Sequence, residues 1–385
     1  MATLAENEEI GLAIVGCGQI VTHHCKALGA VGNIRIKALC DPSQKRRDII
    51  RQICQDENLL SNEAVQECNS LEHLLKNYQE ISDQCQVVFI AVPHDLHVSI
   101  ATTALDAGKH VVLEKPLAPS LKSCHELQKT SLKSQGMLIV AEQSPYWQEI
   151  KKAKECIEMG KIGDLVSAAS YYYESMRDNV TSGLDADGGL GWRCSLDRCG
   201  GGIVIDGGLH WMRPLRELCG DVLSVVGVTQ NCEPGLGLEG ETLAHALFKI
   251  RNKHADGKEL LATFSANMMH TAPMCHDDAP YFRLTGTKGE IIVPGTGLNP
   301  DGGGGLRIYD DENPKGKDLF PKGRQGGFFL GFQGLWHSVI KNLRKNDRAK
   351  AQRSVRDAAA DVALAMAIYK SSKSGQWEKC ELFDN

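Results

Sequence analysis

The chain has 385 residues, of which 42% are hydrophobic and 24% are charged, and its formal net charge is −5. This length is enough for two domains, and without a block of like charge or an apolar run of roughly eighteen residues we expect neither nucleic acid nor a membrane as a partner. The 14 cysteines are scattered without metal-ligand spacing, so we expect reduced thiols, a cytoplasmic protein and no metal site.

The first strong element is an apolar strand predicted at Gly11–Val15, followed at once by a glycine turn and a helix. Strand, glycine turn and helix open a dinucleotide-binding unit, because the glycines let backbone N–H groups approach a pyrophosphate. The third glycine of the usual pattern is replaced by Val21, and a lone Gly-x-Gly is also compatible with a plain turn. The residues that we expect to bind the cofactor here are Gly16, Gly18, Gln19 and Ile20.

An acidic residue, Asp41, directly follows a second predicted strand at Ile34–Cys40. It stands 23 positions after Gly18, close to the spacing of a carboxylate that binds the adenosine ribose, and this favours NAD. Lys45 and Arg46 can instead meet the 2′-phosphate of NADP, so both cofactors stay open. An N-cap of the next helix is the structural alternative for Asp41.

Two further apolar runs, Val87–Val92 and His110–Leu113, predict buried strands. Because ligands of an open parallel sheet bind at the carboxyl ends of its strands, we expect cofactor and substrate to meet beside Lys115. A histidine in such a loop is as readily a capped loop residue as a functional one. The residues singled out after the two runs are Pro93, His97, Glu114 and Lys115.

Helices at Val98–Ala107 and Ser120–Ser134, with a strand at Met137–Val140 after them, continue the alternation to about residue 141. This alternation predicts a doubly wound parallel α/β sheet in a first domain at 1–142. After it, a helix at Gln148–Met159 leads into a β-rich region. Strands are predicted there at Leu165–Tyr173, Leu223–Gly227, Leu243–Ile250, Leu260–Met268, Tyr281–Gly286 and Glu290–Val293, and the chain ends with a helix at 354–372.

Asp206 and His210 stand four residues apart after the run Gly200–Gly202. On a helix, this spacing places both side chains on one face, where they can share a partner. An Asp–His hydrogen bond that serves only packing is the structural alternative. Trp192 and Arg193 follow a glycine-rich loop at Gly188–Gly191, and their side chains can stack on or hydrogen-bond a ligand.

Together these motifs resemble the glucose–fructose oxidoreductase, inositol dehydrogenase and rhizopine-catabolism (Gfo/Idh/MocA) superfamily of NAD(P)-dependent oxidoreductases. The resemblance implies a Rossmann domain at 1–142 and an α/β domain at 143–385 with a large, mostly antiparallel open sheet. It also implies a homodimer or homotetramer formed through the open sheet face. The motifs that carry it are Gly16-Cys17-Gly18-Gln19-Ile20 with His24, Pro93 with His97, Ala107–Val111, Glu114-Lys115-Pro116 and Asp206 with His210.

The resemblance further places Lys115, Asp206 and His210 around the reacting hydroxyl of a sugar, cyclitol or related polyol. Histidine has an unperturbed pKa of about 6.5 and lysine one of about 10.4, so we expect His210 to be the base and Lys115 mainly to polarise the oxygen. Lys115 is the alternative base if desolvation or a neighbouring cation lowers its pKa. The chain departs from the family at Arg213, where sugar-acting members often carry an acid. The implied substrate contacts are Gln143, Tyr146, Trp192 and Arg193, with domain-interface packing as the alternative.

Two other functions remain open. A cofactor-retaining glycosidase would use a tightly held NAD to oxidise the sugar, permit elimination and then be regenerated. A catalytically silent NAD-binding regulator would keep the fold and lose the chemistry, which the presence of Lys115, Asp206 and His210 argues against.

Overall fold

A computed structural model of the chain describes residues 8–60, 65–173, 190–232, 235, 237–255, 258–268, 280–294, 305–320 and 327–383. Gly188 and Gly189 of the predicted glycine loop lie outside these residues. The chain divides into two compact units. The first comprises Met1–Glu142 and Phe332–Ala359, and the second comprises Gln143–Gly331 and Ala360–Asp384.

The first unit is built on a six-stranded sheet in which neighbouring strands are all parallel. Its order, β3-β2-β1-β4-β5-β6, reverses direction at β1, as in a doubly wound sheet. The predicted parallel α/β fold is therefore confirmed. The strands are β1 (Ile10–Val15), β2 (Ile34–Cys40), β3 (Gln66–Cys68), β4 (Val87–Ile90), β5 (His110–Glu114) and β6 (Leu138–Ala141).

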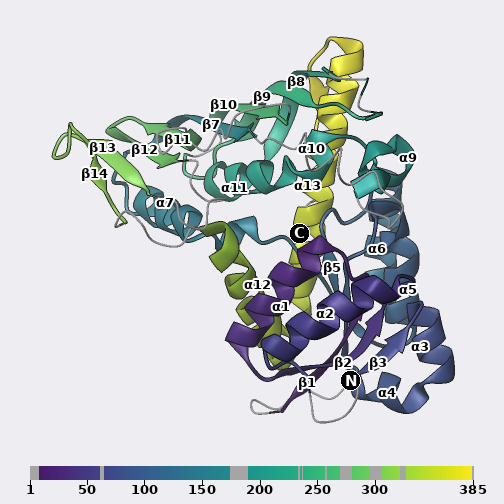
Figure 1. Ribbon diagram of the computed structural model, residues 1–385. Helices are drawn as coiled ribbons and strands as arrows, with labels where there is room; N and C mark the ends of the chain where they lie inside the picture. The colour runs from purple at the N-terminus through teal and green to yellow at the C-terminus, as the bar shows by residue number, and fades with distance from the viewer. Residues whose placement is uncertain are drawn as a thin grey trace. The chain divides into compact units, whose positions relative to one another are not determined.

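Helices of the first unit pack in pairs, with α1 beside α2 and α5 beside α6 (Figure 1). Serine caps begin three of them, because Ser43, Ser70 and Ser120 each accept the N–H three residues further on. The N-cap of α2 is thus Ser43, and the cap alternative for Asp41 is wrong. The helices are α1 (Gln19–Val31), α2 (Gln44–Asp56), α3 (Leu71–Asn77), α4 (Gln79–Gln84), α5 (His97–Asp106) and α6 (Leu121–Lys133), with a 3₁₀ turn, η1, at His94–Leu96.

The segment Phe332–Ala359 belongs to the first unit, whereas the predicted boundary placed everything after residue 142 in the second domain. This segment contains most of α12 (Gly327–Lys345) and the first part of α13 (Arg348–Ser374). The indole Nε1 of Trp336 donates to His24 Nδ1 at 3.0 Å, and Val140 N donates to the Ser354 hydroxyl at 2.9 Å. Contacts between residues so far apart in the chain leave no local pattern from which to predict them.

His110, at the start of β5, gives the first unit an acid-sensitive position. The residue is 4% exposed, and its Nδ1 accepts the Met137 N–H at 3.0 Å. Protonation of Nδ1 would place its N–H against the Met137 N–H, so that two donors would face each other. Burial, with a smaller contribution from the Arg348 charge, lowers the pKa of His110 from 6.5 to about 4.

Below about pH 6.5 His110 therefore becomes protonated in the unfolded chain, whereas in the folded chain it stays neutral down to about pH 4. Acid thus favours the unfolded state in this pH range. We expect the free energy of unfolding to fall more steeply between about pH 7 and about pH 5 in the wild type than in His110→Asn. The asparagine amide oxygen can accept the same N–H without titrating. Guanidinium denaturation at both pH values measures this, with His337→Asn, at an exposed histidine, as control. Equal slopes in wild type and His110→Asn would contradict the expectation.

The second unit is built on a nine-stranded sheet of order β14-β13-β12-β11-β7-β10-β9-β8-β15. Only the central pair β7 and β10 is parallel, and the remaining neighbours are antiparallel. The predicted mostly antiparallel sheet is therefore confirmed. Its strands are β7 (Leu165–Tyr173), β8 (Val222–Gln230), β9 (Leu243–Arg251), β10 (Glu259–Asn267), β11 (Pro280–Gly286), β12 (Gly289–Pro294), β13 (Arg307–Asp310), β14 (Lys317–Asp318) and β15 (Glu378–Lys379).

Helices cover one face of this sheet, where α11 packs against β7 and β10 (Figure 1). The contact is aromatic, since Trp211 stacks on Tyr172 with ring centroids 4.0 Å apart. In the part of the chain that the structure describes, no helix has both the length and the apolar character needed to cross a bilayer. The helical elements are α7 (Gln148–Glu158), α9 (Leu196–Cys199), α10 (Ile203–Asp206) and α11 (Leu209–Cys219), with 3₁₀ turns η2 (Ser144–Tyr146) and η3 (Leu190–Cys194).

Candidate functional site

The glycine turn after β1 leaves an open cradle at the start of α1. Gly16 has φ +86°, and a Cβ there would lie 2.3 Å from the Ala91 carbonyl oxygen, so only glycine fits. Gly18 is different, because no heavy atom lies within 4 Å of the place where its Cβ would stand. It is the N-cap of α1 and makes no side-chain cap, so the first N–H groups of the helix face that cradle. The turn fits a pyrophosphate.

Asp41 ties the end of β2 to this turn. One carboxylate oxygen accepts the Cys17 N–H and the other accepts the Ser43 N–H, each at 2.8 Å. Each oxygen keeps a second lone pair, with which it can accept a ribose hydroxyl. Burial, and next the charge of Asp41, raise the pKa of the Cys17 thiol well above its usual range, so the turn carries no thiolate. The residues present therefore fit the adenosine side of a dinucleotide.

The contrast between the two glycines gives a direct test of this cradle. We expect Gly18→Ala to fold normally, because its Cβ meets nothing, and to weaken NADH binding at least about tenfold, because the methyl group occupies the space that a pyrophosphate needs. Titration by nicotinamide fluorescence measures the affinity, and thermal unfolding checks the fold. An unchanged NADH affinity would remove the cradle from the cofactor site.

Lys115 follows β5 at the same edge of the sheet as the glycine turn, because β1, β4 and β5 are parallel neighbours. The Lys115–Pro116 peptide bond is cis. His97, at the start of α5, is fully buried beside this segment, with Nδ1 2.8 Å from the Pro116 carbonyl oxygen and Nε2 3.0 Å from that of Val92. The structure thus places the His97 ring against the backbone that follows Lys115.

Burial lowers the pKa of His97, and the two carbonyl groups oppose that shift. A neutral imidazole has one N–H and donates to only one of the two carbonyl oxygens, whereas the protonated ring donates to both. Pro93, at the end of the preceding loop, precedes the 3₁₀ turn η1 that leads into α5. Pro93 and His97 therefore lie just after the carboxyl end of β4, at the sheet edge that also carries Lys115.

The Glu114 carboxylate is hydrogen-bonded by a buried histidine, His24, and nothing in the sequence indicated that these two residues pair. His24 Nε2 lies 2.7 Å from Glu114 Oε1. Because an indole only donates, the bond from Trp336 makes His24 Nδ1 the acceptor, and Nε2 therefore carries the proton that Glu114 accepts. His24 also packs against the rings of Phe89 and Phe332. Glu114 and His24 are 90 residues apart, a separation that leaves no motif to recognise.

In the second unit, Asp206 ends α10 and His210 lies in the first turn of α11. The expected single helix is therefore interrupted at Gly207 and Gly208. Both glycines are crowded, because a Cβ on Gly207 would lie 2.2 Å from the Tyr172 hydroxyl and one on Gly208 would lie 2.6 Å from the Val204 carbonyl oxygen. This close packing explains the two glycines of the motif better than a phosphate contact would.

Asp206 pairs with Arg193, whose Nε lies 2.7 Å from Asp206 Oδ2. The Arg193 guanidinium also lies over the Trp192 ring, 4.2 Å from its centroid. Arg193 and Asp206 line a small hollow of about 30 Å³ within the second unit, together with Tyr172, Glu241, Leu238 and Met268. The structure thus brings together three of the predicted site residues in the second unit, and this hollow has both polar and apolar walls.

Glu241 is a structural member of this region that the sequence did not reveal. Its carboxylate accepts the N–H groups of Gly202 and Val204 at 2.9 Å each, and also the Tyr369 hydroxyl at 2.8 Å. Burial raises the pKa of Glu241, while these donors partly oppose the shift. Glu241 therefore anchors the start of α10 and with it the position of Asp206. Among the described residues, no group of three His, Cys, Asp or Glu side chains is placed to hold a metal ion.

Gln143 directly precedes the short η2 turn, and Tyr146 is the last residue of that turn. The Gln143 amide oxygen accepts the Trp147 indole N–H, and the amide nitrogen is buried without a hydrogen-bond partner among the described residues. Tyr146 is half-buried, with Lys151 Nζ 5.3 Å from its ring centroid. Arg213, where the sequence departs from the family, is buried and paired with Asp361 at 2.6 Å. Its role is structural.

These features define a class. A doubly wound parallel sheet with a glycine cradle and an acid after β2, joined to a unit with a mostly antiparallel sheet, is a dinucleotide-binding protein with a Rossmann unit. Residues 10–142 match the family model of an oxidoreductase family with an NAD-binding Rossmann fold, and residues 150–292 match the model of the GFO/IDH/MocA C-terminal domain. The chain belongs to the Gfo/Idh/MocA family, and its first unit is an NAD-binding domain.

Similar proteins agree with this placement. A levoglucosan dehydrogenase solved in complex with NADH and levoglucosan superposes with a TM-score of 0.77 over 98% of this chain and 100% of that one, at 18% identity. A 1-carboxy-3-chloro-3,4-dihydroxycyclo hexa-1,5-diene dehydrogenase of Comamonas testosteroni is 37% identical over 24% of this chain and 22% of its own length. A glycosyl hydrolase family 109 protein of Solibacter usitatus is 26% identical over 49% of this chain and 42% of its own. Neither of these two alignments spans half of the relative's length.

Proposed function

We propose that this chain is an NAD-dependent oxidoreductase that transfers a hydride between nicotinamide and a secondary alcohol or carbonyl of a sugar, cyclitol or related polyol. The observation that carries the proposal is the position of Lys115, at the sheet edge that also holds the glycine cradle. Family membership and the likeness to a levoglucosan dehydrogenase support the choice of substrate class.

In this proposal the chain manages the proton and the oxygen of the reacting group. When bound, the nicotinamide of NAD supplies the carbon that takes up or returns the hydride. His210 accepts the hydroxyl proton, and the Lys115 ammonium polarises the oxygen from which it leaves. Asp206, fixed by its ion pair with Arg193, orients the substrate. Of the cofactor contacts proposed at the first unit's edge, Gly18 and Asp41 carry the clearest geometry.

The substrate contacts proposed in the second unit are Gln143, Tyr146, Trp192 and Arg193. Gln143 has an amide N–H that is buried and without a partner among the described residues, so it can donate to a substrate hydroxyl without breaking another bond. Trp192, already under the Arg193 guanidinium, offers the flat apolar surface on which sugar rings stack.

Purified protein incubated with NAD and a panel of sugars, inositols and sugar acids tests the function. The proposal predicts that at least one compound reduces the cofactor, measured by the absorbance of reduced nicotinamide, and that the oxidised product of that compound reoxidises NADH in the reverse direction. A silent regulator would bind NADH tightly and show neither reaction. No member of the panel would reduce NAD, and no keto derivative of a member would oxidise NADH.

The match to a glycosyl hydrolase family 109 protein supports a second candidate, an NAD-retaining glycosidase. In this reaction the sugar would be oxidised by NAD, the aglycone alcohol would leave by elimination, water would add to the resulting double bond and the hydride would be returned, so that the cofactor undergoes no net change. Nitrophenyl glycosides separate the two candidates. Release of nitrophenol without accumulation of reduced nicotinamide supports the glycosidase, and reduction without cleavage supports the dehydrogenase.

We also propose that two copies associate through the open face of the second sheet. Strands β9 and β10 alternate buried and exposed residues, and the exposed face carries Leu247, Leu261 and Val228, which are 48%, 57% and 64% exposed. Light scattering tests this, because Leu247→Glu should lower the molar mass to that of one chain. Leu132→Glu, at a residue of similar exposure on α6, should leave it unchanged. A wild-type molar mass of one chain would contradict the proposal.

A reducing, cytoplasmic setting is also part of the proposal. All cysteines in the described part of the chain are free thiols, and most are buried. Such thiols persist where glutathione and thioredoxin keep them reduced.

A further inference from the structure

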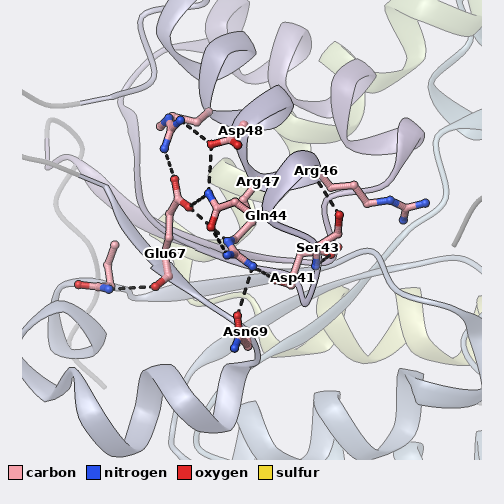
Figure 2. A network of polar contacts seen from close by, with 10 residues as sticks. Asp41, Ser43, Gln44, Arg46, Arg47, Asp48, Glu67 and Asn69 are labelled. Atoms are coloured by element: carbon pink, nitrogen blue, oxygen red, sulfur yellow. Dashed lines mark hydrogen bonds and ion pairs between the residues drawn. The ribbon is translucent and has the colours of Figure 1, made fainter. Parts of the chain in front are cut away.

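A compact ion-pair cluster lies beside Asp41, between α2 and β3 (Figure 2). Glu67, on β3, accepts from Arg47 Nε at 3.2 Å and from Gln44 Nε2 at 2.7 Å, and it also accepts from Arg51 Nη1. Asp48 accepts from Arg51 Nη2 at 2.5 Å. Glu67 is thus the acceptor on which both guanidinium groups of the cluster converge.

Arg47 is committed at every nitrogen of its guanidinium. It is 6% exposed, and besides Glu67 it donates to the Asp41 carbonyl oxygen, to Gln44 Oε1 and to Asn69 Oδ1. Arg47 donates to the backbone carbonyl of Asp41 and so fixes the end of β2, while the Asp41 carboxylate accepts the Cys17 N–H of the glycine turn. Arg47 therefore serves the geometry of the ribose-binding edge, and its charge is matched by Glu67 rather than offered to a ligand.

The charge of the cluster also opposes an anion. Within the ion pairs of the cluster, the Arg47 and Arg51 guanidinium groups face the Asp48 and Glu67 carboxylates beside Asp41, so these pairs offer no net positive charge to an anion next to the expected site of the adenosine ribose. NADP differs from NAD by a 2′-phosphate, which adds a charge of about −2. Arg46, a candidate from sequence for meeting that phosphate, has its guanidinium directed away from Glu67 in Figure 2.

We propose that Glu67 is a second determinant, beside Asp41, of discrimination against NADP, because its carboxylate holds the Arg47 and Arg51 guanidinium groups in ion pairs. This inference rests on NAD binding and is independent of the substrate that the enzyme takes. It assigns a role in specificity to a residue that is 26 positions away from Asp41 in the chain and has no motif of its own.

The test compares dissociation constants for NADH and NADPH, measured by nicotinamide fluorescence, in the wild type and in charge-removing variants. The wild type should bind NADH more tightly than NADPH. Glu67→Gln keeps the shape and frees the charge of both arginines, so it should tighten NADPH binding about tenfold and change NADH binding by less than about threefold. The gain should shrink as salt is added, because it is electrostatic.

Two further variants keep the result interpretable. Asp48→Asn removes the more exposed carboxylate on Arg51 and should give a smaller gain for NADPH, which decides the matter if Glu67→Gln does not fold. Glu126→Gln removes one exposed charge on α6, beyond the opposite end of the sheet, and should change neither constant. Unchanged NADPH affinity in both cluster variants, equal losses for both cofactors, or a wild type that prefers NADPH would overturn the inference. Correct cofactor preference without turnover would refute only the proposed function.

Discussion

Lys115→Met should lower kcat by at least about a hundredfold while leaving the NADH dissociation constant within about threefold of the wild type. Methionine keeps most of the length of the side chain and loses the ammonium group that we propose polarises the reacting oxygen. The matched control is Lys109→Met, at the amino end of the same strand, where Nζ donates to the Ser82 carbonyl oxygen at 2.6 Å. Its kcat should stay near that of the wild type, because that end of the sheet carries none of the proposed chemistry.

His210→Asn separates the roles of the two residues. If His210 is the base, the variant loses at least about a hundredfold in kcat/KM. Removing both groups should cost less than the product of the single losses, because both are assigned to one reacting alcohol. His337→Asn is the control on an exposed histidine. Retained activity in Lys115→Met and His210→Asn together would remove both residues from the proposed chemistry.

Asp361→Asn should destabilise the second unit by about 3–5 kcal/mol, the largest stability effect that we expect from a single substitution. Asp361 is 2% exposed and accepts from Arg213 Nε at 2.7 Å and from Arg216 Nη1. It thereby ties α11, which begins three residues after Asp206, to the middle of α13. An asparagine would leave two guanidinium groups with little compensation in a buried setting, and this is costly because neither can lose its proton.

The matched control for this prediction is Asp221→Asn. Asp221 faces the same Arg216 at 3.8 Å, but its side chain is 53% exposed, so its loss should cost no more than about 1 kcal/mol. Guanidinium denaturation followed by tryptophan fluorescence measures both variants. Equal effects at the two positions would show that the buried pair contributes no more than the exposed one.

Local patterns in the sequence were sufficient to predict most of the fold. Apolar runs marked β1, β2, β4, β5 and β6, and the predicted limits of β7 coincide with those observed. The strand β3, Gln66–Cys68, was not predicted, because three mostly polar residues at a sheet edge leave no hydrophobic signal. The start of α13 was placed six residues too late, since the stretch Arg348–Arg353 is mostly polar.

The residues of the candidate site also fall into those that the sequence could predict and those that it could not. Residues in motifs of short spacing, such as the glycine turn and Lys115, could be selected from the sequence because turn and strand chemistry restrict the residue types there. Pairings between distant residues could not be selected. His24 meets Trp336 across 312 residues, and Asp206 found its partner in Arg193 and not in a continuous helix face. The sequence selects the residue types, whereas the tertiary packing determines which of them act together.

The central claim is that this chain moves a hydride between nicotinamide and the carbon of a polyol, and isotope transfer tests it most directly. Protein incubated with NADH deuterated at both C4 positions and with a panel of keto sugars and inosose derivatives should yield an alcohol product that carries one deuterium on the newly formed carbinol carbon, as seen by mass spectrometry and NMR. Lys115→Met should yield almost none. Products without deuterium, or no product from any member of the panel while NADH stays tightly bound, would contradict the account.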